Sequence, residues 1–284
     1  MTNSIKDIAE SKCVFVLGSN TFEQHPLIGR SIVRAKQNGG KVIVADPRYT
    51  PPTARQADLY MPFVSGTDVA VLNGLMQEII KNGQEDKEFI QRRTKDFENL
   101  KKAVMKDDYS LENVSKISGI PPVESLRTAA EWIATADVAT LIYSMGITQH
   151  TVGVDNVKST ANLMMLTGNL GKPGAGVNPL RGQNNVQGAC DMGALPNVYS
   201  GYQKVTDEAA QTKMKEMWGG VEEIAEGKVG YTVTEMVNIL AENPGKLKAM
   251  YIMGENPMLS DPISATSRRG GSRTSSSWSS RTSS

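Results

Sequence analysis

Short apolar runs alternate with amphipathic stretches along the N-terminal part of the chain. Residues 13–17, CVFVL, are continuously apolar, which is typical of a strand buried on both faces. Apolar positions then recur at helical spacing from Leu27 to Ala35, and the glycine pair at 39–40 ends this predicted helix. The alternation continues with a predicted strand that runs into a turn within 41–48 and predicted strands at 59–64 and 139–143. Predicted helices lie at 65–80, 121–133 and 155–166, and a charged helical region without a clean period lies at 84–120.

This alternation predicts an α/β fold, a doubly wound, Rossmann-like parallel sheet with helices on both faces. A partial repeat extends the pattern. Segments 12–20 and 248–256 share a lysine, an apolar run and Gly-x-Asn, and Pro26 and Pro262 keep the same offset. We interpret both segments as a strand that runs into a nucleotide-binding turn. Chance similarity between two βα turns is the alternative.

Three regions follow from these patterns. We predict the Rossmann-like domain at 1–182, part of a second α/β domain at 183–263 and a disordered tail at 264–284. The tail has ten serines, four arginines and no acidic residue, so it cannot offset the entropy of ordering its chain. We interpret it as the product of a reading-frame shift or a truncated gene. A natural basic tail that binds nucleic acid is the alternative.

Composition excludes several classes of protein. The net charge is +1 over 284 residues, with both signs spread along the chain, which favours neither nucleic acid nor a membrane surface as a partner. No apolar run is long enough to span a membrane, and the N-terminus lacks a signal-peptide pattern, so we expect a cytoplasmic protein. Two cysteines and two histidines cannot form a disulfide framework, a four-cysteine iron–sulfur cluster or a metal site. We expect Cys13 to be buried core.

Polar residues follow the first two predicted strands. Gly18, Ser19 and Asn20 follow the first strand, with Glu23 and His25 just beyond, where a helix N-terminus offers free N–H groups to phosphate. The loop lacks a full G-x-G-x-x-G and does not argue for NAD.

Asp46 follows the second strand, where a carboxylate would meet a ribose or a base edge. Arg48 could pair with phosphate or with Asp46 itself. A simple Asp-Pro-Arg turn is the alternative interpretation.

The segment from Gly168 to Gly193 contains seven glycines and two prolines around a single arginine, Arg181. Glycine permits positive φ and close approach of another group, and arginine and amide side chains supply hydrogen-bond donors. We predict a loop folded around a large, anionic ligand. An ordinary long surface loop is the alternative.

Four segments carry a resemblance to a known family. They are NPLRGQNNVQGACDMGALP at 178–196, MGITQHTVGVDNV at 145–157, LMMLTGNLGKPGAGVNPLRG at 163–182 and MYIMGENP at 250–257. The chain resembles molybdenum- or tungsten-dependent formate dehydrogenases of the molybdopterin oxidoreductase family over about residues 5–262. The resemblance implies an oxidoreductase of anaerobic metabolism that converts formate to carbon dioxide with molybdopterin guanine dinucleotide.

The resemblance also implies which residues contact the cofactor. Successive loops would hold one dinucleotide, while the loop after the second copy of the repeat would serve another. The implied contacts are Gly18, Ser19, Asn20 and Glu23; Asp46, Pro47 and Arg48 near the guanosine; Gly66, Thr67 and Asp68; Met145, Gly146 and Gln149 nearer the pterin and metal; Gly182, Gln183 and Asn184; and, for the other dinucleotide, Gly254, Glu255 and Asn256.

Arg181 is the implied catalytic residue. Its planar, permanently charged guanidinium fits a carboxylate in two parallel hydrogen bonds and could orient formate. In the alternative, Arg181 binds pterin phosphate, while Asn184, Asn185 and Gln187 position pterin or backbone. We assign His150 a structural or supporting role and expect Cys190 not to be the metal ligand.

The resemblance implies further parts outside these segments. A [4Fe–4S] cluster and the metal-ligating cysteine or selenocysteine would belong to an N-terminal region, and a flavin- or deazaflavin-linked beta subunit would take the electrons. We therefore expect this chain alone to be inactive in formate-dependent dye reduction. Another molybdopterin oxidoreductase, such as a nitrate reductase, and a non-enzymatic nucleotide- or cofactor-binding module are the alternatives.

Overall fold

The computed structural model of the chain describes residues 1–120, 122–219, 227–243 and 245–256. The chain divides into two units, Met1–Asn184 and Asn185–Ser284. The first unit holds two large clusters of buried apolar side chains, one on each face of a sheet, and the second holds one small cluster.

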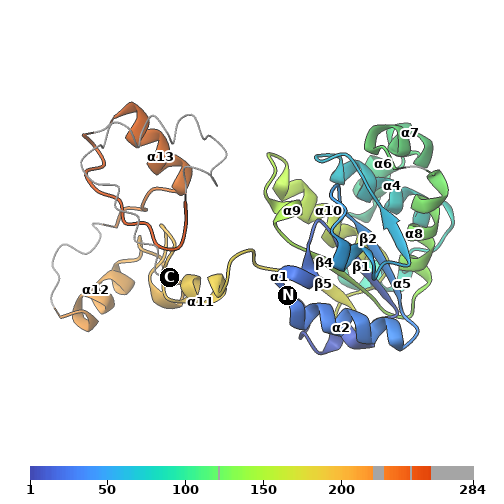
Figure 1. The fold of residues 1–284 in the computed structure, drawn as a ribbon, viewed down its shortest axis with the longest axis horizontal. Helices are drawn as coiled ribbons and strands as arrows, with labels where there is room; N and C mark the ends of the chain where they lie inside the picture. The colour runs from blue at the N-terminus through green and yellow to red at the C-terminus, as the bar shows by residue number, and fades with distance from the viewer. Residues whose placement is uncertain (121, 220–226, 244, 257–284) are drawn as a thin grey trace. The chain divides into compact units, whose positions relative to one another are not determined.

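A five-stranded parallel sheet forms the centre of the first unit, in the order β3-β2-β1-β4-β5 (Figure 1). Its strands are β1 (Cys13–Leu17), β2 (Lys41–Ala45), β3 (Leu59–Met61), β4 (Ala139–Tyr143) and β5 (Gly176–Pro179). Cys13 lies beside Lys41 on one side and Ala139 on the other, so the central strands start level with one another. All five residues of β1 are buried, as expected for a central parallel strand covered on both faces.

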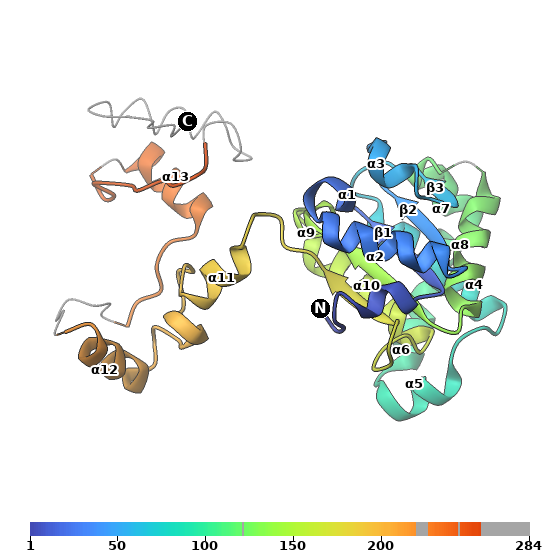
Figure 2. The ribbon, with the colours of Figure 1, turned by 60° about the horizontal axis from the view of Figure 1, so that its bottom comes forward.

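One face of the sheet is covered by α2 (Pro26–Gln37), with η1 (Asp7–Glu10) packed beside it (Figure 2). Successive side chains of a strand point to opposite faces. Val14 and Val16 of β1 therefore pack with Ile28 and Ile32 of α2. The short helices α1 (Thr21–Gln24) and α3 (Pro51–Ala54) follow β1 and β2 in the chain.

The opposite face carries the larger core. Phe15 and Leu17 of β1 belong to the same buried cluster as Leu72 and Leu75. Its helices are α4 (Asp68–Lys81), α8 (Val123–Thr135) and α10 (Gly153–Leu166), with α5 (Lys87–Arg93), α6 (Phe97–Val104), η2 (Asp107–Tyr109) and α7 (Leu111–Ser118) packed outside them.

The connections change face between β1 and β4. β1 runs to β2 through α2 on one face, whereas β4 runs to β5 through α9 (Met145–Thr148) and α10 on the other. The loops that leave β1 and β4 therefore diverge and open a crevice at the carboxyl edge of the sheet. In open α/β sheets this is where ligands bind.

The structure confirms the doubly wound parallel sheet and corrects the length of one strand. The strands predicted at 13–17 and 139–143 form over those residues, and the strand predicted within 41–48 ends at Ala45, before its turn. The strand predicted at 59–64 ends at Met61. The next residue is Pro62, which has no N–H to donate to the ladder.

The prediction that 168–193 is loop throughout is wrong at two places. Residues 176–179 form the edge strand β5, and Val186–Asp191 form α11. β5 forms because β4 offers it a partner: Gly176 lies beside Thr140, and the buried Asn178 donates from Nδ2 to Thr140 Oγ1 at 2.7 Å. The repeated glycines of this segment are typical of a loop, so the sequence pattern did not predict the short strand.

The second unit is helical in its described residues. It contains α11, η3 (Ser200–Tyr202), α12 (Glu208–Met217) and α13 (Val233–Glu242), with isolated antiparallel bridges at Leu195–Val198 and Val198–Lys204. Its small core is Tyr199, Val205, Ala210 and Met214. A capping box at Thr232 and Glu235 starts α13: Glu235 N–H donates to Thr232 Oγ1, and Thr232 N–H donates to Glu235 Oε2.

The strand predicted at 249–253 is absent. These residues carry no regular structure, and Tyr251 and Met253 are 87% and 80% exposed. A lone apolar run gains little as a strand without a neighbouring strand to complete its hydrogen bonds. The prediction that residues 248–256 repeat the strand and turn of residues 12–20 is therefore wrong. Pro262 and the tail at 264–284 lie outside the described residues, and the domain assignments at 1–182 and 183–263 stay predictions.

Leu72 and Leu27 offer a matched test of the core. Leu72 is fully buried between α4 and the sheet, whereas Leu27 on α2 is 64% exposed. We expect Leu72→Ala to lower the free energy of unfolding by about 2–5 kcal/mol, because it removes buried methyl groups and leaves a cavity. Leu27→Ala should change it by less than about 0.5 kcal/mol. Urea unfolding followed by circular dichroism measures both, and equal effects would contradict this assignment of the core.

Candidate functional site

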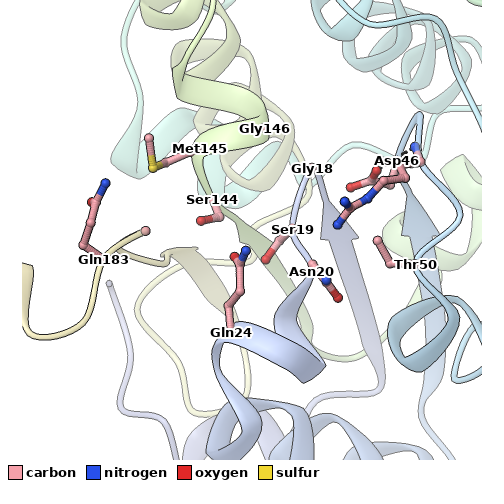
Figure 3. Close-up of a pocket in the computed structure, with 12 residues that line it drawn as sticks. Gly18, Ser19, Asn20, Gln24, Asp46, Thr50, Ser144, Met145, Gly146 and Gln183 are labelled. Atoms are coloured by element: carbon pink, nitrogen blue, oxygen red, sulfur yellow. Dashed lines mark hydrogen bonds between the residues drawn. The ribbon is translucent and has the colours of Figure 1, made fainter. Parts of the chain in front are cut away.

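A cavity of about 250 Å³ lies at the carboxyl edge of the sheet, where the loops after β1 and β4 leave the strands (Figure 3). The loops after four of the five strands contribute to its wall, and most of the side chains are polar. The lining residues are Gly18, Ser19, Asn20 and Gln24 after β1; Asp46, Arg48 and Thr50 after β2; Ser144, Met145 and Gly146 after β4; and Gly182 and Gln183 after β5.

Two glycines bring the loops after β1 and β4 into backbone contact. Gly18 has φ +57°, a left-handed conformation that glycine adopts without strain. A Cβ on Gly18 would lie 2.9 Å from the carbonyl carbon of Gly146, and a Cβ on Gly146 would lie 2.5 Å from the Gly18 oxygen. Neither position accepts a side chain, so this part of the cavity is formed by bare backbone.

A third glycine holds the loop after β5 against the same region. A Cβ on Gly182 would overlap the Met145 sulfur. The β5 end is also fixed by hydrogen bonds: Leu180 N–H donates to the Tyr143 oxygen at 2.8 Å, and Ser144 Oγ donates to the Leu180 oxygen at 3.0 Å. Met145 and Gln183 consequently lie on the same side of the cavity (Figure 3).

Several polar side chains of the wall are bonded within the protein. Asn20 donates to Glu23 Oε2 at 2.5 Å and accepts from Thr53 Oγ1 at 3.1 Å. Ser19 Oγ bonds Thr21 Oγ1 at 2.9 Å. These bonds fix the shape of the turn after β1, so the exposed Glu23 supports the wall without lining the cavity.

Asp46 lies on the opposite side of the cavity (Figure 3), and Arg48 of the same turn also lines it. The Arg48 N–H donates to Asp46 Oδ1 at 2.8 Å, and Tyr60 OH donates to the Asp46 carbonyl oxygen at 3.1 Å. Burial raises the pKa of the Asp46 carboxyl above its usual value, and the Arg48 charge opposes this shift. The site thus places an acceptor and a permanent cation on one short turn.

Asp68 is a second carboxyl near this edge. It begins α4, is 1% exposed, and its two carboxylate oxygens find no hydrogen-bond partner in the described residues. Burial raises the pKa of Asp68, and the nearby backbone N–H of Asp68 itself, the nearby His150 and the backbone N–H of Gly66 partly oppose the shift. His150 itself bonds the Gly146 oxygen through Nε2 at 2.9 Å. This bond ties His150 to the α9 turn and agrees with a structural role.

The polar, glycine-lined crevice at the switch point is the kind of site that holds a phosphate-bearing cofactor. A family model described as Molybdopterin oxidoreductase matches residues 1–269. The chain belongs to the molybdopterin oxidoreductase family.

Known relatives refine this assignment. The chain is 54% identical over 262 residues to F420-dependent formate dehydrogenase 1 subunit alpha of Methanococcus maripaludis, covering 92% of this chain and 37% of that one. It is 45% identical over 261 residues to formate dehydrogenase H of Escherichia coli, covering 92% and 35%. The chain thus spans little more than a third of the length of these curated relatives.

A solved structure supports the fold. Acetylene hydratase from Pelobacter acetylenicus matches with a TM-score of 0.52 and 26% identity, covering 58% of this chain and 24% of that one. None of the helices in the described residues combines the length and low polarity that crossing a membrane requires.

The cavity gathers nine of the residues that the family resemblance implies as contacts. These are Gly18, Ser19, Asn20, Asp46, Arg48, Met145, Gly146, Gly182 and Gln183. Glu23, Pro47, Gly66, Thr67, Asp68, Gln149 and Asn184 belong to the first unit but do not line the cavity, while Gly254, Glu255 and Asn256 belong to the second unit. Contact of any of them with a cofactor stays a prediction.

Gln24, Thr50 and Ser144 line the cavity and were not predicted from the sequence. Ser144 directly follows the strand at 139–143, so its position after a buried strand was an available signal. Gln24 is the last residue of α1, and Thr50 directly precedes α3. Whether they line the cavity depends on where these two short helices lie. No periodicity marks such positions.

Arg181 and the cysteines complete the list of sequence candidates. Arg181 follows the buried Leu180, is exposed and does not line the cavity, although its neighbour Gly182 does. Cys13 is buried in the sheet as expected, and burial raises the pKa of its thiol to about 12. Cys190 is buried on α11 in the second unit. His25 precedes α2 and does not line the cavity.

The structure fits the cofactor of this family in its chemistry. Gly18, Gly146 and Gly182 line the cavity without side chains, and Asp46, Arg48, Gln24 and Gln183 offer polar groups around it. A cavity of about 250 Å³ is smaller than most small-molecule sites and suits one part of a dinucleotide.

Asp68 generates a prediction about stability and pH. A carboxyl whose native pKa is raised binds its proton more tightly when folded, so stability falls as pH rises from 3.8 through the native pKa. Asp68→Asn removes the ionisable carboxyl and therefore removes this loss of stability. We expect its Tm at about pH 7 to exceed that of wild type, because the variant has no carboxyl to ionise in the buried site.

The gain should shrink as the pH is lowered toward about 4, because the wild-type carboxyl then takes up its proton. Thermal unfolding across this range measures the difference, with the exposed Asp137→Asn as the matched control. A Tm difference that does not change with pH, or a lower Tm for Asp68→Asn at neutral pH, would contradict the prediction.

Proposed function

We propose that the chain binds part of a molybdopterin guanine dinucleotide, carrying molybdenum or tungsten, in the cavity of its first unit, and serves in the oxidation of formate to carbon dioxide. The observation that carries the proposal is the cavity itself: nine residues implied by the resemblance converge on the switch point of the sheet. Similarity to formate dehydrogenase alpha subunits supports formate as the substrate.

The nucleotide end of the ligand belongs at the turns after β1 and β2. Backbone N–H groups of Ser19 and Asn20 would meet phosphate, while Asp46 and Arg48 would contact the guanosine. Met145, Gly146, Gln149 and Gly182–Asn184 would lie nearer the pterin, and the Gly66–Asp68 loop would add further contacts. Gly254, Glu255 and Asn256 would serve a second dinucleotide.

Arg181 would hold formate. A guanidinium stays charged at every physiological pH and presents parallel N–H groups that match the two oxygens of a carboxylate. Such a clamp fixes which way the formate C–H points, and orientation of this kind lowers the barrier to reaction. When bound, the metal–dithiolene group supplies the two-electron redox chemistry.

Electrons would leave through further parts of the assembly. We infer a [4Fe–4S] cluster outside this chain's sequence and a beta subunit linked to a flavin or deazaflavin, consistent with the F420-dependent names of two relatives. We place the activity in the cytoplasm.

Nucleotide binding by the chain can be tested directly. We expect guanosine diphosphate to bind the chain in calorimetric titration, and Arg48→Ala to raise Kd by about tenfold or more, because a charged hydrogen bond contributes about 1.5–3 kcal/mol. Arg34→Ala is the matched control, since Arg34 is exposed near the end of α2 and does not line the cavity. Absence of binding would reject the nucleotide site.

Arg181 can be tested in a chimera in which this chain replaces the matching 262 residues of the Methanococcus maripaludis alpha subunit. We expect Arg181→Ala to lower formate-dependent dye reduction by about 10²–10³-fold, the usual effect of removing one preorganised donor. Arg181→Lys should recover only part of it, because lysine lacks the planar fork.

Metal and pterin content, measured on the same samples, should be unchanged in both variants, and Arg30→Ala on α2 serves as the control. Loss of pterin together with activity would instead assign Arg181 to cofactor binding. Full activity of Arg181→Ala would remove the clamp.

A further inference from the structure

Thr50 has a buried hydroxyl that the fold leaves without a partner. The residue is 3% exposed, lines the cavity, and its Oγ1 makes no hydrogen bond within the described residues (Figure 3). A buried polar atom of this kind costs stability and calls for a physical explanation.

The sequence explains why no local partner exists. Thr50 is the N-cap residue of α3, a position where a threonine hydroxyl ordinarily accepts an N–H from the second or third residue of the helix. Here Pro51 and Pro52 occupy the first two helical positions and have no N–H. The Thr53 N–H is the remaining candidate, and the hydroxyl does not accept from it.

Neighbouring hydroxyls and amides on the same wall differ from Thr50. Asn20 is bonded to Glu23 and Thr53, Ser19 to Thr21 and Ser144 to Leu180. These groups shape the cavity. The Thr50 hydroxyl makes no such bond, so a role in holding the wall does not explain why a hydroxyl is buried there.

The position of Thr50 indicates what it could bind. It shares the turn after β2 with Asp46 and Arg48, and a carboxylate at this point of a dinucleotide-binding sheet typically meets ribose hydroxyls. A carboxylate only accepts hydrogen bonds, whereas a threonine hydroxyl both donates and accepts, as do the paired hydroxyls of ribose. Rotation about the Cα–Cβ bond can turn the Thr50 hydroxyl toward the cavity without moving the backbone.

We propose that the Thr50 hydroxyl is a specificity contact for the ribose of the nucleotide bound in this cavity. The proposal rests on the proposed function and adds a residue to it. It also implies that the protein is less stable without ligand than it would be with an apolar residue at position 50.

The test uses the full chain, guanosine diphosphate and its 2′,3′-dideoxy analogue. Thr50→Val keeps the shape of the side chain and removes the hydroxyl, and Thr50→Ser keeps the hydroxyl. For guanosine diphosphate we expect Thr50→Val to raise Kd by about 5–10-fold, the effect of one ordinary hydrogen bond, and Thr50→Ser to stay within about twofold of wild type. For the dideoxy analogue, all three proteins should bind equally.

The ligand-free protein supplies an independent readout. Thr50→Val should raise its Tm by about 2–4 °C, because the unpaired hydroxyl is gone. A variant that weakens binding while stabilising the fold cannot be explained by misfolding.

Two results would overturn the proposal while leaving nucleotide binding intact. One is wild-type affinity of Thr50→Val for guanosine diphosphate, and the other is an equal loss of affinity for the dideoxy analogue. If wild type itself fails to bind guanosine diphosphate, the proposed function fails first, and the Thr50 contact fails with it.

Discussion

The contact between Gly18 and Gly146 is the constraint on which the candidate site depends. Gly18 directly follows β1, Gly146 lies in the short helix α9 after β4, and their backbones approach so closely that neither accepts a Cβ. This approach joins the loops after β1 and β4 at the edge of the sheet from which the connections leave for opposite faces. The parallel register fixes the strand ends, and the two glycines set how close the following loops lie. The polar groups of the cavity are held around this contact.

The polar groups around this point fall into two kinds. Asn20, Ser19 and Ser144 bond to other protein groups and therefore hold the wall in one shape. Thr50 is different, because the fold buries its hydroxyl without a hydrogen-bond partner in the described residues. It shares the turn after β2 with Asp46, whose pKa is raised by burial. Strained or unsatisfied groups persist when the surrounding structure compels them, and they concentrate where a ligand completes them. The side of the cavity nearest β2 is therefore the side at which we expect specificity.

How far the sequence predicts this structure depends on the kind of signal. Continuous apolar runs identify β1 and β4 to the residue, because a central parallel strand is buried on both faces. The run at 249–253 looks equally apolar, yet it forms no strand. The hydrophobicity of a segment shows that it could be buried as a strand. It does not show whether an adjacent strand is available to pair with it. β5 shows the converse, since β4 recruits a glycine-rich segment with almost no strand signal.

The same distinction applies to the site. Asp46 follows a strong strand and could be placed by pattern alone, whereas Thr50 depends on a turn whose course is set by two prolines. Arg181 is different again: it is exposed, lies outside the cavity lining, and has no periodic neighbours that would single it out. Only the likeness of its whole segment to a family motif identifies it. Packing predicts the residues that build a site, because burial leaves a pattern. An exposed residue leaves no such pattern, so the role of Arg181 must be established by measurements on the substrate itself.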